Sequence, residues 1–120
     1  MSSRRPAAAL ATAALALTAS APATAQAAAT VERGRALLAQ YQCGTCHAIP
    51  GVPSSRGQVA QPLDGWRHRS YIAGRLPNRE EVLARWITAP QALVPGTQMP
   101  SMGVSPQDAQ AMAAYLFTLE

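Results

Sequence analysis

The sequence contains no lysine, only two cysteines and only six aromatic residues (two Trp, three Tyr and one Phe) in 120 residues. Two cysteines exclude a scaffold held by several disulfides, and they also exclude a zinc or iron–sulfur site built from four thiolates of one chain. A length of 120 residues corresponds to one domain and excludes a large multidomain enzyme. The chain is rich instead in alanine, proline and arginine.

The N-terminal part lacks an apolar run that is long enough to cross a membrane. The run from Ala7 to Ala19 holds only Ala and Leu apart from two threonines, and its length of about 13 residues falls short of the ~20 that a spanning helix needs. Arg4 and Arg5 precede this run, and small residues follow it as far as Ala27. The order of basic, apolar and small residues is typical of a secretory signal peptide.

We therefore predict a signal peptide over residues 1–25, with cleavage near residues 25–27, and one exported domain over residues 28–120. An uncleaved leader helix that anchors the protein is the alternative. Removal of the two leader arginines lowers the formal net charge from +4 to +2. The remaining arginines are spread from Arg33 to Arg85 and do not form the dense basic stripe that nucleic-acid binding needs. A nucleic-acid partner is therefore not expected.

Apolar residues of the exported part recur at helical spacing, and no segment alternates polar and apolar residues as a strand would. Two long segments, residues 43–69 and 89–104, are rich in proline and glycine and are predicted to be loops. Loops of this length in a small domain indicate that the chain surrounds a buried cofactor. The predicted fold is all-α, with three or four short helices: one capped by Thr30 and ending near Tyr41, a helical turn over Ser70–Arg75, one capped by Asn78 and ended by Pro90, and one beginning at Ser105-Pro106.

One short motif carries the chemistry: Cys43-Gly44-Thr45-Cys46-His47, a C-x-x-C-H run. This is the attachment pattern of c-type haem, in which the two thiols form thioethers with the haem vinyl groups and the adjacent His reaches the iron. A thioredoxin-like dithiol needs a βαβ context, and a zinc site needs a second pair of ligands at a suitable spacing, which His68 does not provide. A plain disulfide is the remaining alternative. The helical pattern, the long loops and the export signal favour one covalently bound haem c.

Beyond this motif, the region from Thr30 to Glu120 resembles the class I c-type cytochromes, specifically the small bacterial periplasmic monohaem kind. The resemblance is carried by G-T-Q-M-P at residues 96–100, by A-A-Y-L at residues 113–116 and by Q-P-L-D-G at residues 61–65. It implies the cytochrome c fold, with short helices and long loops wrapped around one covalent haem. It also implies that a glycine of the first helix, Gly34, faces an aromatic residue of the last helix, Tyr115.

The resemblance implies that His47 and Met99 are the two axial ligands of the haem iron. Met102, three residues further along the same loop, and His68 are the competing candidates for the sixth position. Met112 lies on the inner face of the final helix, where methionine commonly fills the core. A sixth position without any side-chain ligand is the last alternative.

The same resemblance implies further haem-binding residues: Pro62, Trp66, Arg69, Tyr71 and Trp86. The carbonyl of Pro62 is expected to accept the ring N–H of His47, which would orient the ring. Arg69 is expected near a haem propionate, with Trp66 and Tyr71 as further donors; a solvated surface charge is the alternative for Arg69. Trp86 is expected to pack against the haem edge or within the core.

The expected function is that of a periplasmic carrier of single electrons. An iron with two axial ligands has no open position, so we expect neither enzymatic activity nor a small-molecule substrate. The partners would be redox proteins that dock transiently, aided by exposed arginines such as Arg56, Arg67, Arg69 and Arg75. Two alternatives stay open: an electron-transfer subunit of a larger complex, hosted by a membrane oxidase or a periplasmic dehydrogenase, and a gas-binding or gas-sensing haem protein in which Met99 is absent from the iron or easily displaced.

Overall fold

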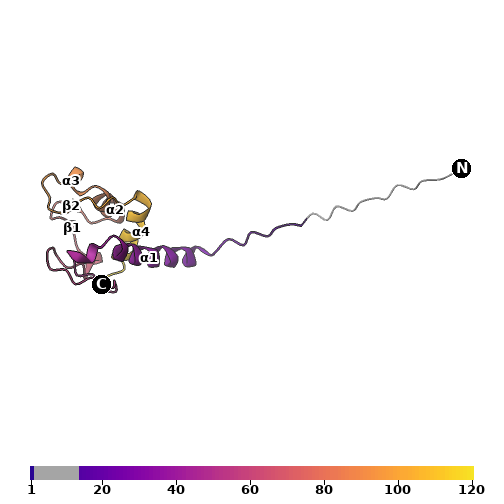
Figure 1. Ribbon diagram of the computed structural model, residues 1–120, viewed down its shortest axis with the longest axis horizontal. Coiled ribbons are helices and arrows are strands. Elements are labelled where there is room, and N and C mark those ends of the chain that lie inside the picture. Colours follow the sequence, from indigo (N-terminus) through magenta and orange to yellow (C-terminus); the bar gives the residue numbers. More distant parts are fainter. Residues whose placement is uncertain (2–13) are drawn as a thin grey trace.

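The computed structural model describes Met1 and residues 14–120 (Figure 1). Arg4, Arg5 and the first half of the apolar run of the predicted signal peptide lie outside the described residues. Residues 14–22 are exposed, have no secondary structure and extend away from the folded part. Within the described residues, the helices are all too short or too polar to span a bilayer.

Four α-helices make up most of the regular structure of the described residues: α1 (Ala23–Gln40), α2 (Glu80–Thr88), α3 (Pro90–Leu93) and α4 (Pro106–Leu116). The loops between them contain two 3-10 turns, η1 (Cys43–Thr45) and η2 (Trp66–His68), and an antiparallel hairpin of β1 (Tyr71–Ile72) and β2 (Leu76–Pro77). Figure 1 shows α4 between α1 on one side and α2 on the other, with α3 and the hairpin beyond α2. The predicted architecture of short helices and long loops is confirmed.

The first helix begins earlier than predicted. Pro22, not Thr30, is the residue before its first turn, and the Thr30 hydroxyl donates to the Gln26 carbonyl inside the helix at 3.0 Å. Residues 23–29 are mostly alanine, which has the highest intrinsic helix propensity. The alanine run therefore extends the helix backward past the residue that resembled its cap.

The last helix begins as predicted. Ser105 Oγ accepts a hydrogen bond from the backbone N–H of Asp108 at 3.1 Å, and Pro106 occupies the first helical position. Asp108 also ties α4 to α1, because its carboxylate pairs with the guanidinium of Arg33 and accepts a hydrogen bond from the Tyr41 hydroxyl at 2.9 Å. This hydrogen bond, and next the removal of water, raises the pKa of Tyr41.

The two terminal helices meet backbone to backbone at Gly34. A Cβ atom at this position would lie 1.8 Å from the carbonyl oxygen of Ala111, so that only glycine fits without displacement. The predicted close approach at Gly34 is confirmed, but its predicted partner is wrong, since the nearest atoms belong to the backbone of Ala111 and Met112. Tyr115 lies one turn further along α4, where its hydroxyl donates to the Pro50 carbonyl at 2.7 Å.

Residues 70–75 do not form the predicted helical turn, because β1 pairs with β2 there in antiparallel register. Ala73 and Gly74 both have positive φ, at 51° and 70°, which is the combination that a tight type I′ hairpin turn requires. Ala-Gly is a weaker turn signal than Asn-Gly or Asp-Gly, and strands of two residues are too short to show an alternating pattern. The hairpin was therefore not visible in the sequence.

Helix α2 begins at Glu80, two residues after its predicted cap. Asn78 forms no capping bond to α2; its side-chain amide donates instead to the carbonyls of Trp66 and Arg69, at 3.0 Å each. Two acidic residues in the first turn stabilise the start of the helix through its dipole. The helix ends two residues before Pro90, as predicted, and Pro90 opens the short helix α3.

The core lies where α1, α2 and α4 meet, and it continues beneath the loops. Its largest fully buried side chains come from five different elements: Leu38, Ile72, Leu83, Pro90 and Met112. All of them except Pro90 also line a cavity on one side of the core. The core and the cavity therefore share a wall, and packing of the helices shapes both.

We predict that Gly34→Ala destabilises the protein by about 2 kcal/mol, because the added methyl group overpacks the contact with Ala111 and α1 must move away from α4. The change can be measured as a lower midpoint of thermal or urea unfolding. Ala36→Ser, on the exposed face of α1, is the matched control and should alter stability by less than about 0.5 kcal/mol. Equal stability of Gly34→Ala and the control would show that the helices do not cross at this point.

Candidate haem site

A cavity of about 610 Å³ opens on one side of the core, between α1, α2, α4 and the loops. This volume lies within the range of about 300–1,000 Å³ that is typical of sites for organic ligands. It is lined by most of the residues that were predicted to hold a haem: Cys43, Cys46, His47, Trp66, Arg69, Tyr71, Trp86 and Met99. Pro62, His68 and Met102 do not line it, whereas Met112 does. A second hollow of about 860 Å³, between α1, α2, α3 and α4, contains none of these residues.

Local backbone geometry places the C-x-x-C-H motif at the cavity. After α1 ends, Gln42 adopts the left-handed conformation (φ 57°) and turns the chain into η1. Within the motif, the backbone N–H of His47 donates to the carbonyl of Cys43 at 3.0 Å, which folds the five residues into one compact turn. Gly44 is needed because a Cβ there would lie 2.2 Å from the hydroxyl of Ser55 in the following loop.

Both cysteines are partly buried and free in the structure, and both line the cavity. Burial raises the pKa of the Cys43 thiol, because an apolar environment disfavours the thiolate. Among the described residues, no three His, Cys, Asp or Glu side chains lie close enough to hold a metal ion together. Two free thiols that line one large cavity suit attachment of an organic group.

The ring of His47 is held by the main chain, but not by the predicted residue. Its Nδ1 lies 2.6 Å from the carbonyl oxygen of Gln61, whereas the carbonyl of Pro62 contacts the guanidinium of Arg69. The backbone N–H of Leu63 donates to the carbonyl of Ala48 at 2.8 Å and fixes the register of this loop. With that register, the carbonyl of Gln61 faces the ring and the carbonyl of Pro62 faces elsewhere.

Because a carbonyl can only accept, Nδ1 of His47 is the donor, and in the neutral form of the ring Nε2 then has the free lone pair. A neutral imidazole with this tautomer is the form that binds a metal ion, and the hydrogen bond at the other nitrogen fixes the direction of the ring. The residues around the motif therefore prepare His47 as a ligand.

Met99 reaches the same cavity from the loop before α4, and it is partly buried. Gly96, with φ of 83°, and the flanking prolines Pro95 and Pro100 restrict this loop. The backbone N–H of Met99 lies 3.4 Å from the hydroxyl of Thr97, which adds a weak local contact. A stiff loop lowers the entropy cost of holding the thioether sulfur in one place.

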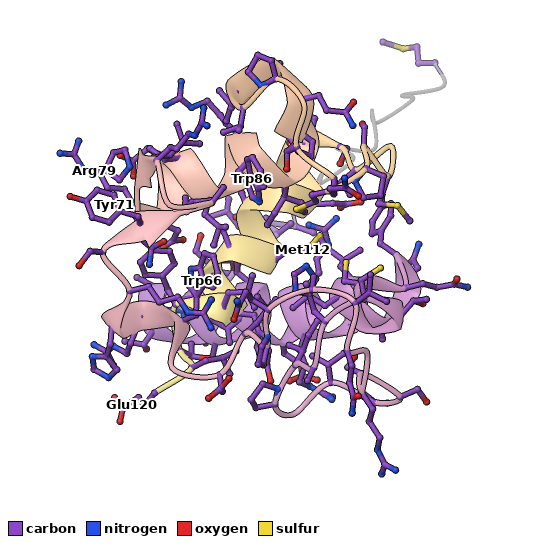
Figure 2. The ribbon with its side chains drawn as sticks, turned by 90° about the vertical axis from the view of Figure 1, so that its left-hand side faces the viewer. Trp66, Tyr71, Arg79, Trp86, Met112 and Glu120 are labelled. Carbon is purple, nitrogen blue, oxygen red and sulfur yellow. The ribbon has the colours of Figure 1, made fainter. Side chains whose placement is uncertain are left out.

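Two polar groups lie on the cavity wall at η2, those of the buried Trp66 and of Arg69, which follows η2 and is partly exposed; we call them the polar wall. Trp66 is only 6% exposed, and its indole N–H has no hydrogen-bond partner among the described residues. The guanidinium of Arg69 lies over the Trp66 ring, 4.9 Å from its centroid, and forms no ion pair within the described part of the chain. Figure 2 shows Trp66, Trp86 and Met112 in the interior, whereas Tyr71 and Arg79 lie at the outer edge.

These features fit haem c. Two free thiols, an imidazole and a thioether are the groups that hold such a cofactor and its iron. A buried N–H without an acceptor, such as that of Trp66, is rare in folded proteins. The carboxylate groups of a haem could accept a hydrogen bond from this N–H and pair with the guanidinium of Arg69. Trp86 is both buried and part of the cavity wall, so the two roles expected for it coincide.

Comparison with protein families gives the same assignment. The family model of cytochrome c matches residues 31–120, which is most of the chain. This chain belongs to the cytochrome c family. Members of the family bind haem c covalently and transfer electrons, and Cys43 and Cys46 of this cytochrome fit the attachment motif.

Among curated proteins, the cytochrome is similar to cytochrome c oxidase subunit 2 of Alkalihalophilus pseudofirmus. The two are 35% identical over 89 residues, which cover 73% of this chain and 25% of the relative. The chain therefore spans about a quarter of the length of the curated relative that it matches. No solved structure matches the chain.

Two contributions to the site were not recognised in the sequence. The Gln61 carbonyl is a backbone group, so no residue type marks it, and only the register of the loop selects it. Leu38 and Met112 occupy apolar positions of helices, and helical spacing alone does not distinguish a wall of the core from a wall of the cavity.

We predict that the purified cytochrome retains one haem under denaturing conditions, because two thioethers hold it. Intact mass spectrometry should give the mass of residues 26–120 or 28–120 plus one haem. Replacing Cys43 and Cys46 together by Ala should leave the mass of the polypeptide alone. A double variant that keeps the haem, or a native protein that loses it on denaturation, would contradict covalent attachment through these two residues.

Proposed function

We propose that this cytochrome is an exported carrier of single electrons, with His47 and Met99 as the axial ligands of its iron. The observation that carries the proposal is that two thiols, the imidazole and the thioether of Met99, from segments far apart in the sequence, line one cavity. When bound, haem c supplies an iron that changes between the ferric and ferrous states by one electron. The chain supplies the ligands, the covalent attachment and an environment with little water.

Met99 is the favoured sixth ligand because of where the alternatives lie. Met102 and His68 do not line the cavity, and Met102 is largely exposed. Met112 does line it, but it is fully buried on the rigid helix α4, where it packs with the core. Met99 combines a place at the cavity with a loop that Pro95 and Pro100 stiffen.

Two side-chain ligands would leave the iron no open position for a substrate, which supports electron transfer rather than catalysis. Binding of a gas would need Met99 to leave the iron. The loop that carries Met99 is restricted by two prolines, so moving Met99 away from the iron would cost free energy. This cost favours an electron carrier over a gas sensor.

The surface where partners would dock surrounds the mouth of the cavity. Outside the N-terminal segment, three large hydrophobic side chains are exposed in the described residues: Val59 at 81%, Tyr71 at 60% and Met102 at 46%. Val59 and Tyr71 line the cavity, and Met102 follows two residues after Pro100, which also lines it. We call Val59, Tyr71 and Met102 the apolar rim. Exposed apolar side chains gathered at one site mark an interaction surface.

Of the four arginines that were expected to guide docking, Arg56 and Arg75 are exposed, whereas Arg67 and Arg69 are held by contacts within the chain. Arg67 pairs with Glu120 at 2.7 Å, and the guanidinium of Arg69 is turned toward the carbonyls of Pro62 and Asp64. Among the described residues that line the cavity, only Arg69 carries a formal charge. These contacts favour redox partners that meet the apolar rim with an apolar surface of their own, with little electrostatic guidance.

Export to the periplasm rests on the order of basic, apolar and small residues before Gln26. Cleavage near residues 25–27 would remove the first residues of α1 and leave the part of the helix that contacts α4 intact. The mass measurement described above decides between cleavage after Ala25 and after Ala27. A mass that still includes residues 1–25 would identify the leader as an anchor.

A second candidate function is that of an electron-transfer part of a terminal oxidase. The similarity to a portion of cytochrome c oxidase subunit 2 of Alkalihalophilus pseudofirmus supports it. The two candidate functions use the same haem site. They differ in whether the redox partner docks transiently or is bound stably in one complex. Purification from membranes together with a large oxidase would support the second candidate, and purification as a single small protein would support the carrier.

We predict that Met99→Ala leaves the haem attached, since Cys43, Cys46 and His47 are untouched, but removes the iron–sulfur bond. The weak absorption band of the methionine-ligated ferric iron should disappear, the reduction potential should fall, and carbon monoxide should bind to the ferrous form. Absorption spectra and a redox titration measure all three. Met102→Ala and Met112→Leu are the controls and should keep the band. A band that survives in Met99→Ala and is lost in either control would identify that other methionine as the ligand.

We predict that electron self-exchange between ferrous and ferric copies changes less than about twofold with salt, because two uncharged rims meet. The exchange rate can be measured by NMR while salt is raised so that the Debye length falls from about 30 Å to about 3 Å. A basic docking surface would instead repel its copy, and salt would accelerate exchange severalfold. Val59→Lys should introduce such a salt dependence, whereas Gln91→Lys, an exposed position on α3 away from the cavity, should not.

A further inference from the structure

Asn78 belongs to the same buried cluster as Trp66. The two buried side-chain atoms without a hydrogen-bond partner in the described residues are Nε1 of Trp66 and Oδ1 of Asn78. The two residues are in direct contact, because the side-chain amide of Asn78 donates to the carbonyl of Trp66 at 3.0 Å. Buried polar atoms without a partner are uncommon in folded proteins, so a site where two of them occur in contacting residues is a candidate place for a polar group of a ligand.

The hairpin brings Asn78 back beside the turn η2. One N–H of its amide is directed to the carbonyl of Trp66 and the other to the carbonyl of Arg69, each at 3.0 Å. Its backbone N–H donates to the carbonyl of Ser70, also at 3.0 Å. Asn78 therefore binds both ends of the segment from Trp66 to Ser70 and determines how this segment lies against the cavity.

The chemistry of position 78 allows few other residues. Two donors on one short side chain are required to reach two carbonyls that are three residues apart in sequence. Aspartate has no donor, serine has one, and glutamine carries its amide on a longer chain. An apolar residue of the same shape would avoid burying the unsatisfied Oδ1, so the benefit of asparagine at this position lies in its two donors.

Two residues of the segment that Asn78 holds, Trp66 and Arg69, line the cavity wall. The indole N–H of Trp66 is buried without an acceptor among the described residues, and Arg69 is partly exposed. The guanidinium is stacked on the Trp66 ring and also contacts the carbonyls of Pro62 and Asp64. The carbonyls of Pro62 and Asp64 belong to the same loop as the Gln61 carbonyl, which lies 2.6 Å from Nδ1 of His47. The position of Asn78 thus affects the polar wall directly and the proximal ligand through the neighbouring loop.

We propose that Asn78 is a positioning residue, which holds Trp66 and Arg69 together as a paired donor site for the carboxylate groups of haem c and thereby keeps the reduction potential high. This inference rests on the proposed function. A carboxylate that receives an N–H and lies beside a guanidinium has much of its negative charge compensated. Loss of this arrangement leaves more negative charge near the iron, which favours the ferric state and lowers the potential.

Asn78→Leu, which keeps the shape and removes both donors, tests the proposal in the intact haem-loaded protein. A redox titration should show the ferric-to-ferrous equilibrium shifted about threefold to tenfold toward the ferric state, as expected for a weakened hydrogen bond to a charged group. Asn78→Ser retains one donor and should give a smaller shift. In the Asn78→Leu variant, NMR should also show faster exchange of the Trp66 indole N–H with solvent.

Ser105→Ala is the matched control for a loss of stability alone. It removes the cap of α4, away from the cavity, and should lower the unfolding temperature without shifting the potential. A double-mutant cycle separates a positioning role from a general one: in a Trp66→Phe, Arg69→Gln background, Asn78→Leu should produce no further shift.

The outcomes are distinct. A native protein without a reversible one-electron step would overturn the proposed function and this inference with it. A reversible native protein whose potential is the same in Asn78→Leu as in Ser105→Ala would overturn this inference alone. If Asn78→Leu shifts the reduction potential equally in the native protein and in the Trp66→Phe, Arg69→Gln variant, the inference is also overturned, because Asn78 would then act without Trp66 and Arg69. Should Asn78→Leu fail to load haem, Asn78→Ser decides by the same comparison.

Discussion

The contact between the backbones of α1 and α4 at Gly34 is the constraint on which the rest of the structure depends. With no side chain between them, the helices approach closely enough for the carbonyl of Ala111 to fill the space of a Cβ atom. The end of α1 then directs the C-x-x-C-H motif toward the interior, and the same crossing turns Met112 and Leu116 of α4 toward the cavity. The ion pair of Arg33 with Asp108 and the hydrogen bond from Tyr41 fasten the crossing at its outer side.

The cavity is bounded on its other sides by loops, and single hydrogen bonds determine how they lie. The loop after the motif is joined to it through the backbone N–H groups of Gly57, Ala60 and Leu63, which donate to carbonyls of residues 44–48. The Met99 loop is restricted by Pro95 and Pro100, and also by hydrogen bonds from the Thr97 backbone N–H to the Val94 carbonyl at 3.1 Å and from the Ser101 hydroxyl to the Thr88 carbonyl at 3.4 Å. Long loops in so small a domain cannot form a dry core by themselves, and a covalently attached haem would supply the apolar surface against which they pack.

Charge is distributed so that the walls and the rim differ. The polar wall combines the partly exposed guanidinium of Arg69 with the buried indole N–H of Trp66, which suits carboxylates of the cofactor. The three side chains of the apolar rim carry no formal charge, and of the neighbouring arginines Arg67 pairs with Glu120 and Arg69 contacts loop carbonyls. One region of the cytochrome is thus suited to binding an acidic group, and the adjacent region is suited to brief contact with another protein.

Local sequence signals were sufficient for the features that depend on a few neighbouring residues. The C-x-x-C-H motif predicted the cofactor, and Pro90 and Ser105-Pro106 predicted where helices end and begin, because proline geometry and a capping hydroxyl act within one turn. The pattern around Met99 led to a residue that the structure places at the cavity. Its bond to the iron remains a prediction.

Only the tertiary structure decided which groups meet across long separations. The register set by Leu63 selected the carbonyl of Gln61 rather than that of Pro62 for His47, and the hairpin turned Asn78 from an expected helix cap into a clamp on Trp66 and Arg69. Crossing of the terminal helices brought Ala111, not Tyr115, against Gly34. In each case the residue types were visible in the sequence, but several groups of suitable chemistry could have formed the contact. The packing of the whole chain selected among them, because a backbone carbonyl or a short side chain bonds only to what the fold places within about 3 Å.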